Sequence, residues 1–204
     1  MSDKNFWNRY YKTHAEADPA SPFASWVIEN YVDLGNLIEL GCGNGRDSFF
    51  FAQNGVNVLG IDQCKDMVGR LNNKKISNAT FQVGDFTKLD SKTEFDSVYS
   101  RFTLHSVDDE EATRTLKWAH TVLRQDSFLF VEVRGIHDEL YGEGKAVGPD
   151  AWFTDHYRRF IRFDAFVEEL KEIGFEIDFS IETSGLAPYG DSDPQIIRVV
   201  AKKI

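Results

Sequence analysis

The chain has 204 residues, of which 42% are hydrophobic and 27% charged, and this is enough to bury one sizeable core. Its formal net charge is −10, from 23 basic and 33 acidic residues, so long-range electrostatics repel a nucleic-acid backbone. No apolar run approaches the roughly 20 residues that span a bilayer, and the start of the chain has no signal-peptide pattern. We expect a cytoplasmic protein with a single domain over residues 1–204, with neither nucleic acid nor membrane as a partner.

Cysteine usage is sparse, since only Cys42 and Cys64 are present. One lies in a glycine-rich turn and the other lies just after a predicted strand. Two thiols form neither a disulfide framework nor a cluster with the spacing of metal ligands. We therefore interpret both as small, reduced side chains of a cytosolic protein, and we expect no metal site.

Two aromatic-rich segments precede the first predicted strand. Residues 6–11 open a short helix, and residues 23–31 form a second helix in which Phe23 and Trp26 recur at helical spacing. A polar break that contains proline separates the two. We expect residues 1–34 to form an N-terminal helical cover. The pattern does not distinguish fixed packing from a lid that closes over a site.

Strand-like and helix-like segments alternate from residue 36 onward. Apolar runs predict strands at residues 36–40, 56–61, 80–83, 95–100 and 128–133, and helical spacing predicts helices at residues 46–53, 66–71 and 109–123. A last helix at residues 164–173 precedes strands at residues 175–179 and 195–201, which suggest a hairpin. Alternating β and α elements predict a mainly parallel sheet with helices on both faces.

The alternation is interrupted between residues 135 and 161. This stretch is rich in Gly, His, Asp, Tyr and Arg and lacks the apolar periodicity of the other segments. Long loops without secondary structure are uncommon in compact domains and are usually functional where they occur. We therefore expect residues 135–161 to form an uncovered loop on the substrate side of a binding site.

A glycine-rich turn is the most informative stretch of the chain. An apolar run ends at Gly41, Gly43 and Gly45, and an amphipathic helical pattern follows. A strand, tight turn and helix start in this order let a ligand approach bare backbone at a helix N-terminus. The third glycine comes one residue earlier than in the dinucleotide fingerprint, and Glu39 lies inside the last turn of the strand. Taken alone, the pattern is equally compatible with an ordinary tight βα turn.

The next two strand ends carry acids. Asp62 follows the second strand, where a carboxylate can accept hydrogen bonds from a ribose diol, and Asp85 follows the third, where it could accept from an exocyclic adenine amine. Phe86 could lie against the ring. Each acid has a plainer alternative, since Asp62 could cap a helix and Asp85 could form a turn. Ligands of doubly wound sheets bind at the carboxyl ends of the strands, and the joint occurrence therefore favours a functional site.

These segments resemble class I S-adenosylmethionine-dependent methyltransferases. Residues 39–45 are similar to the first motif of that family, and residues 95–105 to its fourth. Asp62 matches the ribose-binding acid, and residues 84–86 match the adenine-binding segment. The resemblance extends from residue 36 to the C-terminus. It implies a single methyltransferase domain with a Rossmann-like, doubly wound, seven-stranded, mostly parallel sheet and a C-terminal antiparallel hairpin.

Further likenesses indicate small-molecule acceptors. Residues 45–48 are similar to tellurite- and thiopurine-type enzymes of the family, and residues 138–142 and 156–160 to methyltransferases associated with surface-polysaccharide gene clusters. The resemblance implies that S-adenosylmethionine is the cofactor and S-adenosylhomocysteine the product. The residues assigned to the cofactor are Glu39, Gly41, Cys42, Gly43, Asn44, Gly45, Asp62, Gln63, Asp85, Phe86 and Ser100.

Candidates for the acceptor side come from the end of the fourth strand and from the interrupted stretch. Tyr99, Arg101 and His105 lie where that strand faces the methyl donor in this fold, and they are the catalytic candidates. A role of His105 as general base competes with that of an ordinary buried histidine. The substrate-binding candidates are Tyr11, Arg134, His156, Tyr157, Arg158 and Arg159. Adjacent arginines can bind a phosphate or carboxylate bidentately, although solvated salt bridges are the plainer alternative.

The sequence thus predicts a methyltransferase that acts on an oxygen of a small anionic metabolite or glycan precursor. Methylation of nitrogen, or of sulfur or tellurium in detoxification, is the alternative within enzymes. A regulatory module that binds the cofactor without activity is disfavoured by the complete glycine turn, Asp62 and Asp85. An NAD-dependent oxidoreductase is disfavoured by the early third glycine. We expect a monomer or a homodimer.

Overall fold

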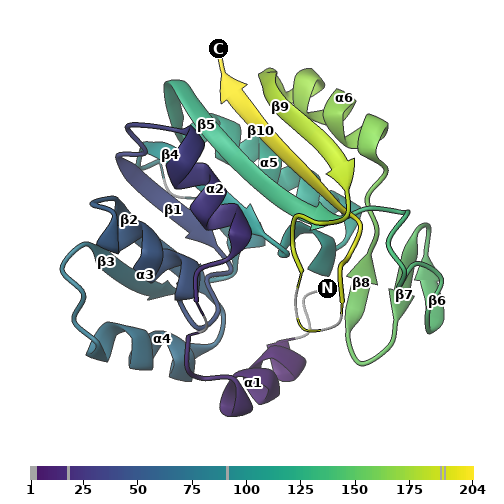
Figure 1. The fold of residues 1–204 in the computed structure, drawn as a ribbon, viewed down its shortest axis with the longest axis horizontal. Coiled ribbons are helices and arrows are strands. Elements are labelled where there is room, and N and C mark those ends of the chain that lie inside the picture. Colours follow the sequence, from purple (N-terminus) through teal and green to yellow (C-terminus); the bar gives the residue numbers. More distant parts are fainter. Residues whose placement is uncertain (1–3, 18, 91, 189, 191) are drawn as a thin grey trace.

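The computed structural model describes residues 4–17, 19–90, 92–188, 190 and 192–204. Its main element is a seven-stranded sheet in the order β3-β2-β1-β4-β5-β10-β9 (Figure 1). The strands are β1 Asn36–Leu40, β2 Asn57–Asp62, β3 Ala79–Val83, β4 Phe95–Arg101, β5 Leu123–Arg134, β9 Phe175–Thr183 and β10 Ile196–Lys203. The helices are α1 Lys4–Thr13, α2 Pro22–Asn30, α3 Arg46–Gln53, α4 Lys65–Asn73, α5 Asp109–Val122 and α6 Phe163–Ile173, with short 3-10 turns η1 Phe86–Lys88 and η2 Leu104–Ser106.

The first five strands of the sheet run parallel. β1 pairs with β2 and β4, β2 pairs with β3, and β4 pairs with β5. β10 lies antiparallel between β5 and β9. The predicted doubly wound sheet with a C-terminal antiparallel hairpin is therefore confirmed. The strand order reverses between β1 and β4, and the carboxyl ends of the strands at such a reversal are where ligands of this architecture bind.

Neighbouring residues on each strand point to opposite faces of the sheet and fill two separate cores. Leu37 packs in the core that contains buried residues of α2, α3 and α4, whereas Ile38 packs in the core under α5 and α6. Tyr99 and Val98 repeat this alternation on β4. Figure 1 shows the two helical layers on either side of the sheet. Because both faces are covered, these strands read in the sequence as nearly continuous apolar runs.

Local signals fix several boundaries. The Asp108 carboxylate accepts a hydrogen bond from the backbone N–H of Glu111 at 2.9 Å, and the Glu111 side chain accepts from the Asp108 N–H, so a capping box begins α5. Helix α3 ends at Gln53 with Asn54 as its C-cap, and Gly55 follows with a φ of 84°. The predicted bounds of β1 and α3 coincide with the observed ones because glycine turns limit both elements.

The stretch that interrupts the alternation forms a second, three-stranded antiparallel sheet. It contains β6 Lys145–Gly148, β7 Ala151–Phe153 and β8 Tyr157–Arg159, in that order. The expectation of an uncovered loop is therefore wrong. Its strands are only three or four residues long and β6 is exposed throughout, so no apolar alternation marked them. Backbone hydrogen bonds of Ile161 with Arg134 and Ile136 tie the small sheet to the end of β5.

The two N-terminal helices differ in how they are held. Helix α2 inserts Phe23 and Val27 into the core, whereas no residue of α1 is buried. Instead, the Phe6 ring stacks on the His156 ring of the small sheet at a centroid distance of 4.3 Å. The predicted cover over residues 1–34 thus includes one helix of the core and one that lies on the surface; residues 1–3 and 18 are outside the described part.

The described residues contain no helix long and apolar enough to cross a membrane. Within that same part of the chain, no three His, Cys, Asp or Glu residues gather in a way that could hold a metal ion. Cys42 and Cys64 are free and buried. Burial, followed by the nearby Asp62 carboxylate, raises the pKa of Cys64 to about 12, so that this thiol is protonated and unreactive at neutral pH.

Candidate active site

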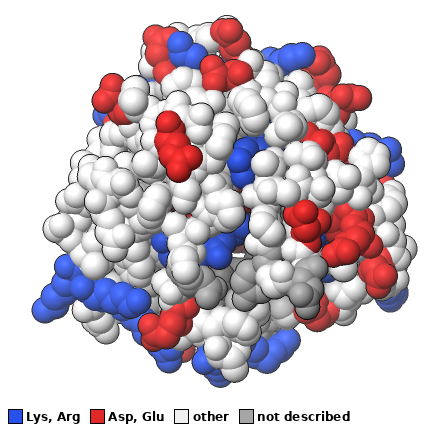
Figure 2. All heavy atoms as spheres, viewed as in Figure 1, with Lys and Arg blue, Asp and Glu red and all other residues white. Residues whose placement is uncertain are grey.

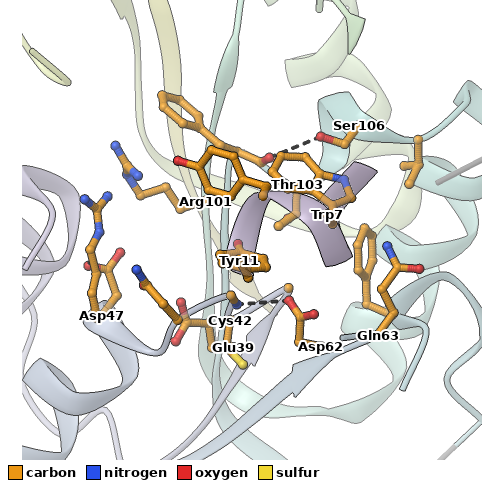
Figure 3. A pocket seen from close by; sticks show the side chains of 18 of the residues that line it. Trp7, Tyr11, Glu39, Cys42, Asp47, Asp62, Gln63, Arg101, Thr103 and Ser106 are labelled. Atoms are coloured by element: carbon orange, nitrogen blue, oxygen red, sulfur yellow. Dashed lines mark hydrogen bonds and ion pairs between the residues drawn. The ribbon is translucent and has the colours of Figure 1, made fainter. Parts of the chain in front are cut away.

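A cavity of about 470 Å³ opens at the carboxyl ends of β1, β2, β3 and β4. Figure 3 shows Tyr11 of α1 projecting toward the glycine turn, with Asp62 and Gln63 on one side and Asp47 and Arg101 on the other. The lining residues are Trp7, Tyr10, Tyr11, Pro22, Glu39, Gly41, Cys42, Gly43, Asn44, Arg46, Asp47, Asp62, Gln63, Gly84, Asp85, Phe86, Arg101, Phe102, Thr103, Ser106, Val107, Arg134, Ala187, Pro188, Ser192 and Pro194.

The glycine turn forms the floor of this cavity. The backbone N–H of Gly41 donates to the Ile61 carbonyl at 2.8 Å, which holds the end of β1 against the end of β2. Gly43 has a φ of 54°, and a Cβ there would collide with the Tyr11 hydroxyl. Only glycine therefore allows α1 to approach the turn so closely. The resulting surface is bare backbone beneath an aromatic side chain.

The Asp62 carboxylate fixes the same turn from the end of β2. It accepts hydrogen bonds from the backbone N–H of Gly43 at 3.0 Å and from that of Cys64 at 2.8 Å. The plainer interpretation, a cap at the start of α4, is thus partly realised, since Cys64 is the residue before that helix. The carboxylate also lines the cavity. Asp62 can therefore support the turn and receive a ligand at the same time.

Asp85 lies at the end of β3. Its carboxylate accepts from the backbone N–H of Thr87 at 3.1 Å and from the Lys88 ammonium at 2.9 Å. Partial burial acts to raise the pKa of Asp85, but these hydrogen bonds outweigh it and the pKa is lowered. Asp85 is thus a carboxylate at neutral pH, able to accept a hydrogen bond. It begins η1, as the turn-forming alternative predicted, and it faces the cavity beside Phe86.

Two acids lie beneath the glycine turn. Glu39 is buried at the end of β1, where it accepts a hydrogen bond from the Ser48 hydroxyl. Burial and then the nearby Asp47 carboxylate raise the pKa of Glu39 to about 8, although the hydrogen bond from Ser48 opposes this. Asp47 in turn accepts from the backbone N–H and the hydroxyl of Ser21 at 2.8 and 2.7 Å. The floor of the cavity therefore holds two adjacent carboxyl groups, of which Glu39 is largely protonated at neutral pH, and a cationic ligand group would favour its ionisation.

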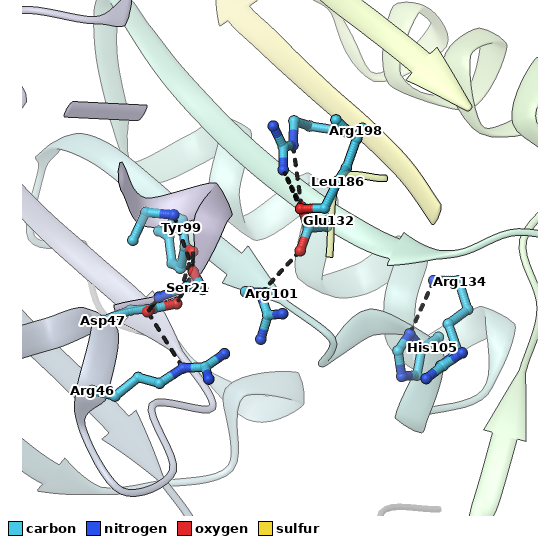
Figure 4. A network of polar contacts seen from close by, with 11 residues as sticks. Ser21, Arg46, Asp47, Tyr99, Arg101, His105, Glu132, Arg134, Leu186 and Arg198 are labelled. Carbon is cyan, nitrogen blue, oxygen red and sulfur yellow. Dashed lines mark hydrogen bonds and ion pairs between the residues drawn. The ribbon is translucent and has the colours of Figure 1, made fainter. Parts of the chain in front are cut away.

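The structure does not bring Tyr99 to the cavity. Its side chain is fully buried among α2 and α3, and its hydroxyl donates to Asp47 at 2.9 Å (Figure 4). Burial and Asp47 raise the pKa of this hydroxyl well above 10, so it remains protonated. Ser100 faces the other core and shares a hydrogen bond with the Thr103 hydroxyl, and Gly45 packs at the start of α3 against Leu71. Neither residue lines the cavity within the described part of the chain.

Arg101 and Arg134 both line the cavity, at the ends of β4 and β5. The Arg101 guanidinium lies 4.3 Å from the centre of the Phe102 ring, and the Arg134 guanidinium lies 5.6 Å from the centre of the same ring. Nη1 of Arg134 donates to Asp138 at 2.6 Å. Phe102 has a φ of 56°, an unusual conformation for a bulky residue. The conformational strain at Phe102 is consistent with a functional position, because strained backbone persists only where surrounding contacts hold it in place.

His105 lies behind this wall rather than in it. The side chain is buried, and Nδ1 accepts a hydrogen bond from the backbone N–H of Arg134 at 3.2 Å (Figure 4). Burial and then the Arg134 charge lower the pKa of His105 well below 6.5, so the ring is neutral at pH 7. It does not line the cavity among the described residues. This arrangement corresponds to the satisfied buried histidine that competed with the general-base interpretation.

The arginines of the small sheet also lie elsewhere. Arg158 donates to the Thr154 hydroxyl at 3.3 Å and lies beside His156. Arg159 donates to Asp109 at 2.6 Å and lines a second cavity together with Tyr157. In the described structure the main cavity includes none of His156, Tyr157, Arg158 and Arg159. Arg159 of β8 lies against η2 and α5, whereas His156 stacks on Phe6 of α1. The sequence of an apparent loop did not reveal these directions.

Two walls of the cavity escaped the sequence interpretation. One is aromatic, from Trp7 and Tyr10 of α1, and the other is the connection between β9 and β10, which contributes Ala187, Pro188, Ser192 and Pro194. Arg46, at the start of α3, was missed as well. The one available signal was composition: a Gly- and Pro-containing connection between two long strands is a common place for binding residues.

Comparisons with known proteins agree with this geometry. Residues 37–126 match a family described as a methyltransferase domain. An uncharacterized methyltransferase of Bacillus cytotoxicus is 24% identical over 165 residues, which cover 76% of this chain and 76% of that protein. A SAM-dependent methyltransferase from Methanosarcina mazei has a similar structure, with a TM-score of 0.73, 23% identity, and coverage of 87% of this chain and 97% of that one.

A third similar structure was solved with ligands. It is the 1,6-didemethyltoxoflavin-N1-methyltransferase of Burkholderia thailandensis with bound 1,6-didemethyltoxoflavin and S-adenosylhomocysteine. The TM-score is 0.70 and the identity 18%, with coverage of 89% of this chain and 76% of that one. Residues 37–126 thus match a methyltransferase domain, and the chain has the fold of SAM-dependent methyltransferases. S-adenosylmethionine is the methyl donor of that class.

Proposed function

We propose that this methyltransferase transfers the methyl group of S-adenosylmethionine to an oxygen of a small anionic molecule. One observation supports the proposal most directly. Arg101 and Arg134 line the same cavity as the glycine turn, Asp62 and Asp85. A donor site and two fixed positive charges therefore share one enclosed space. We therefore assign the anion site to these two arginines instead of Arg158 and Arg159, which the sequence favoured.

The residues of the donor half fit the cofactor. Gly43 leaves no room for a Cβ and exposes backbone, which allows a close approach by the methionine portion. Asp62, Asp85 and Phe86 line the same cavity, which supports a role of Asp62 in accepting from the ribose hydroxyls and of Asp85 with Phe86 in holding the adenine. Buried Glu39 and Asp47 offer two carboxyl groups to the ammonium group of the cofactor, and Glu39 would lose its proton when that cation binds. When bound, S-adenosylmethionine supplies an electrophilic methyl group on a sulfonium.

The acceptor half is positively charged although the whole chain is acidic, with a net charge of −10. Arg46, Arg101 and Arg134 all line the cavity, and Figure 2 shows basic side chains at the opening of the hollow. Guanidinium groups bind carboxylates and phosphates through paired hydrogen bonds. The cavity of about 470 Å³ must hold donor and acceptor together, and it lies within the range that a single ligand usually fills. The acceptor is therefore small.

The protein contributes to the reaction chiefly by positioning. Arg101 and Arg134 orient the acceptor, while Trp7, Tyr10 and Tyr11 cover the cavity and exclude water. Correct placement of two reactants can by itself account for about 7–11 kcal/mol of a barrier. The oxygen of a carboxylate or phosphate carries no proton at neutral pH and needs no general base. This chemistry agrees with His105, which is neutral, buried and already hydrogen-bonded to Arg134.

Methylation of nitrogen is the second candidate. The acceptor side combines the arginines with the aromatic rings of Phe102 and Trp7, and such a surface would also hold a flat heteroaromatic molecule. The N1-methyltransferase of Burkholderia thailandensis, which has a similar fold, supports the same possibility. Oxygen and nitrogen acceptors are separated by analysing the methylated product by mass spectrometry and NMR.

Calorimetry with S-adenosylmethionine, S-adenosylhomocysteine and NAD tests the donor assignment. Heat of binding is expected with the first two and not with NAD; the opposite pattern would falsify the proposal. The acceptor assignment is tested by a screen of small carboxylates, phosphorylated sugars and nucleotide-activated sugars. The Arg101→Ala variant is expected to raise the acceptor KM at least tenfold, with Arg158→Ala as the matched control. A substrate that both variants methylate as well as the wild type would contradict the anion site.

A further inference from the structure

A buried carboxylate stands directly behind the arginine wall of the cavity. Glu132, on β5, is 0% exposed. Its Oε1 accepts from Nε of Arg101 at 2.9 Å, and its Oε2 accepts from Nε and Nη2 of Arg198 at 3.1 and 2.7 Å (Figure 4). Both oxygens are thus engaged by guanidinium groups from the two strands that flank β5, namely β4 and β10.

The two arginines of this cluster are not equivalent. The Arg198 side chain is 3% exposed, and its guanidinium lies 4.8 Å from the centre of the Phe23 ring and 5.0 Å from that of Trp26, on α2. The Arg101 side chain is 15% exposed and lines the cavity. Glu132 therefore joins a structural arginine to one that faces a ligand. One negative and two positive charges leave a net positive charge, and the cavity side carries it.

Stability gives no reason for burying these charges. Burial acts to raise the pKa of Glu132 and the two arginines oppose this, so the carboxylate is costly to keep in the core. Replacing such buried ionic clusters by apolar residues is often neutral or stabilising. Such a cluster is accordingly expected where a side chain must be held in one orientation. Here that side chain is Arg101, whose guanidinium faces the cavity.

The hydrogen bond at Nε determines that direction. A guanidinium is a rigid planar fork, so fixing Nε against Glu132 fixes the plane of the group. The terminal nitrogens Nη1 and Nη2 of Arg101 make no other hydrogen bond within the described residues. Their outer edge is the one that binds a carboxylate or phosphate bidentately. The Phe102 ring, 4.3 Å from the guanidinium, restricts the group from a further side.

The same cluster also supports a second wall of the acceptor half. Nη2 of Arg198 donates to the Leu186 carbonyl at 3.3 Å. The next two residues, Ala187 and Pro188, line the cavity. Ser192 of the same connection donates to Glu139 at 3.1 Å, beyond the end of β5. The connection between β9 and β10 is thereby held at the cavity by Arg198 of β10 and by Glu139, which follows β5 in the sequence.

We propose that Glu132 is the positioning residue of the acceptor subsite, which it orients through Arg101 for bidentate binding of a carboxylate or phosphate group. This inference rests on the proposed function, because it assumes that the cavity holds an anionic acceptor. Glu132 itself touches neither donor nor acceptor. It acts through Arg101 directly and, through Arg198, on the wall that begins at Leu186.

The test compares the wild type with Glu132→Leu, which removes the acceptor oxygens, and with Arg101→Lys, which keeps the charge but removes Nε. Inorganic phosphate is the anion probe, titrated by NMR, and S-adenosylhomocysteine is the donor-side probe, titrated by calorimetry. In the wild type, the Nε–H signal of Arg101, identified from its loss in Arg101→Lys, should be shifted downfield and protected from exchange with water. Glu132→Leu should remove this protection and weaken phosphate binding at least tenfold, with S-adenosylhomocysteine affinity changed less than twofold.

Glu132→Leu leaves Arg198 buried without its partner and can unfold the protein. The double variant Glu132→Leu/Arg198→Met removes both buried charges, so it should fold and still show the loss of phosphate affinity. If either folded variant keeps the protected Nε–H signal and wild-type phosphate affinity, the positioning role is refuted. Failure of the wild type to bind S-adenosylhomocysteine would overturn the proposed function instead. Donor binding without any phosphate affinity in the wild type would remove the anionic subsite, and the role of Glu132 with it.

Discussion

The two halves of the cavity are built in different ways. The donor half is made by consecutive strand ends: the glycine turn after β1, Asp62 at the end of β2, and Asp85 after β3. The acceptor half is assembled from α1, the ends of β4 and β5, and the connection between β9 and β10. The donor half therefore depends on local segments of a parallel sheet. The acceptor half depends on contacts between segments that are distant in the sequence. Variants on the two sides should therefore change different measurable quantities.

The largest effect is expected on the donor side, at Asp62. The Asp62→Ala variant removes the carboxylate that holds Gly43 and that, in the proposed function, binds the ribose. Charge-assisted hydrogen bonds contribute roughly 1.5–3 kcal/mol each, so losing them should weaken S-adenosylhomocysteine binding about 100-fold. Calorimetry measures the change. Asp66→Ala, an exposed acid on α4, is the matched control and should bind like the wild type.

A smaller effect confined to the acceptor side is expected for Arg134→Ala. This change removes one of the two guanidinium groups beside Phe102 and should weaken phosphate binding about tenfold. Donor affinity should stay at the wild-type value. Arg162→Ala, which removes an arginine paired with Asp150 outside the main cavity, serves as the control. An equal loss of donor and phosphate affinity in Arg134→Ala would show that the two halves do not act separately.

Glu39 should make the stability of the folded protein depend on pH. Burial and Asp47 raise its pKa to about 8 from 4.5, so the folded protein holds this proton more tightly than the unfolded chain. Stability should consequently fall as pH rises from about 4.5 to about 8. The Glu39→Gln variant should flatten that fall, as measured by urea unfolding at pH 5 and pH 8.

Donor binding provides a second readout of Glu39. The ammonium group of S-adenosylhomocysteine favours the ionised carboxylate, so binding near pH 7 should release a proton. Calorimetry in two buffers of different ionisation enthalpy counts the protons released. The release should disappear in Glu39→Gln and persist in Asp66→Ala. Equal proton release in wild type and Glu39→Gln would assign the titration to another group.

The smallest effect on catalysis is expected for His105→Asn. The Asn side-chain oxygen can accept the backbone hydrogen bond that Nδ1 of His105 accepts from Arg134, and no proton transfer is lost if the ring is only structural. Because burial lowers the pKa of His105, the wild type should lose stability as pH falls below about 6.5, and the variant should lose less. A shift of the pH profile of kcat in the variant would instead establish His105 as a general base.

Sequence reasoning was reliable where one element carries its own signals. β1 and α3 were predicted with the observed bounds, since a buried apolar run and glycine turns delimit them. It failed between residues 135 and 161, where strands of three or four residues have no periodicity to detect. Tyr99 and His105 were placed near the correct strand end, but their direction depends on which core receives each side chain.

The sequence by itself determined the sheet, its winding and the meeting of the glycine turn, Asp62 and Asp85 at one cavity. The reason is that glycines and acids at successive strand ends must meet at one edge of a parallel sheet. Only the tertiary structure decided the acceptor half. Arg101 faces the cavity because Glu132 and Arg198 hold it there, and Arg159 turns instead toward Asp109. The direction of a long charged side chain is fixed by its partners, and these lie far away in the sequence.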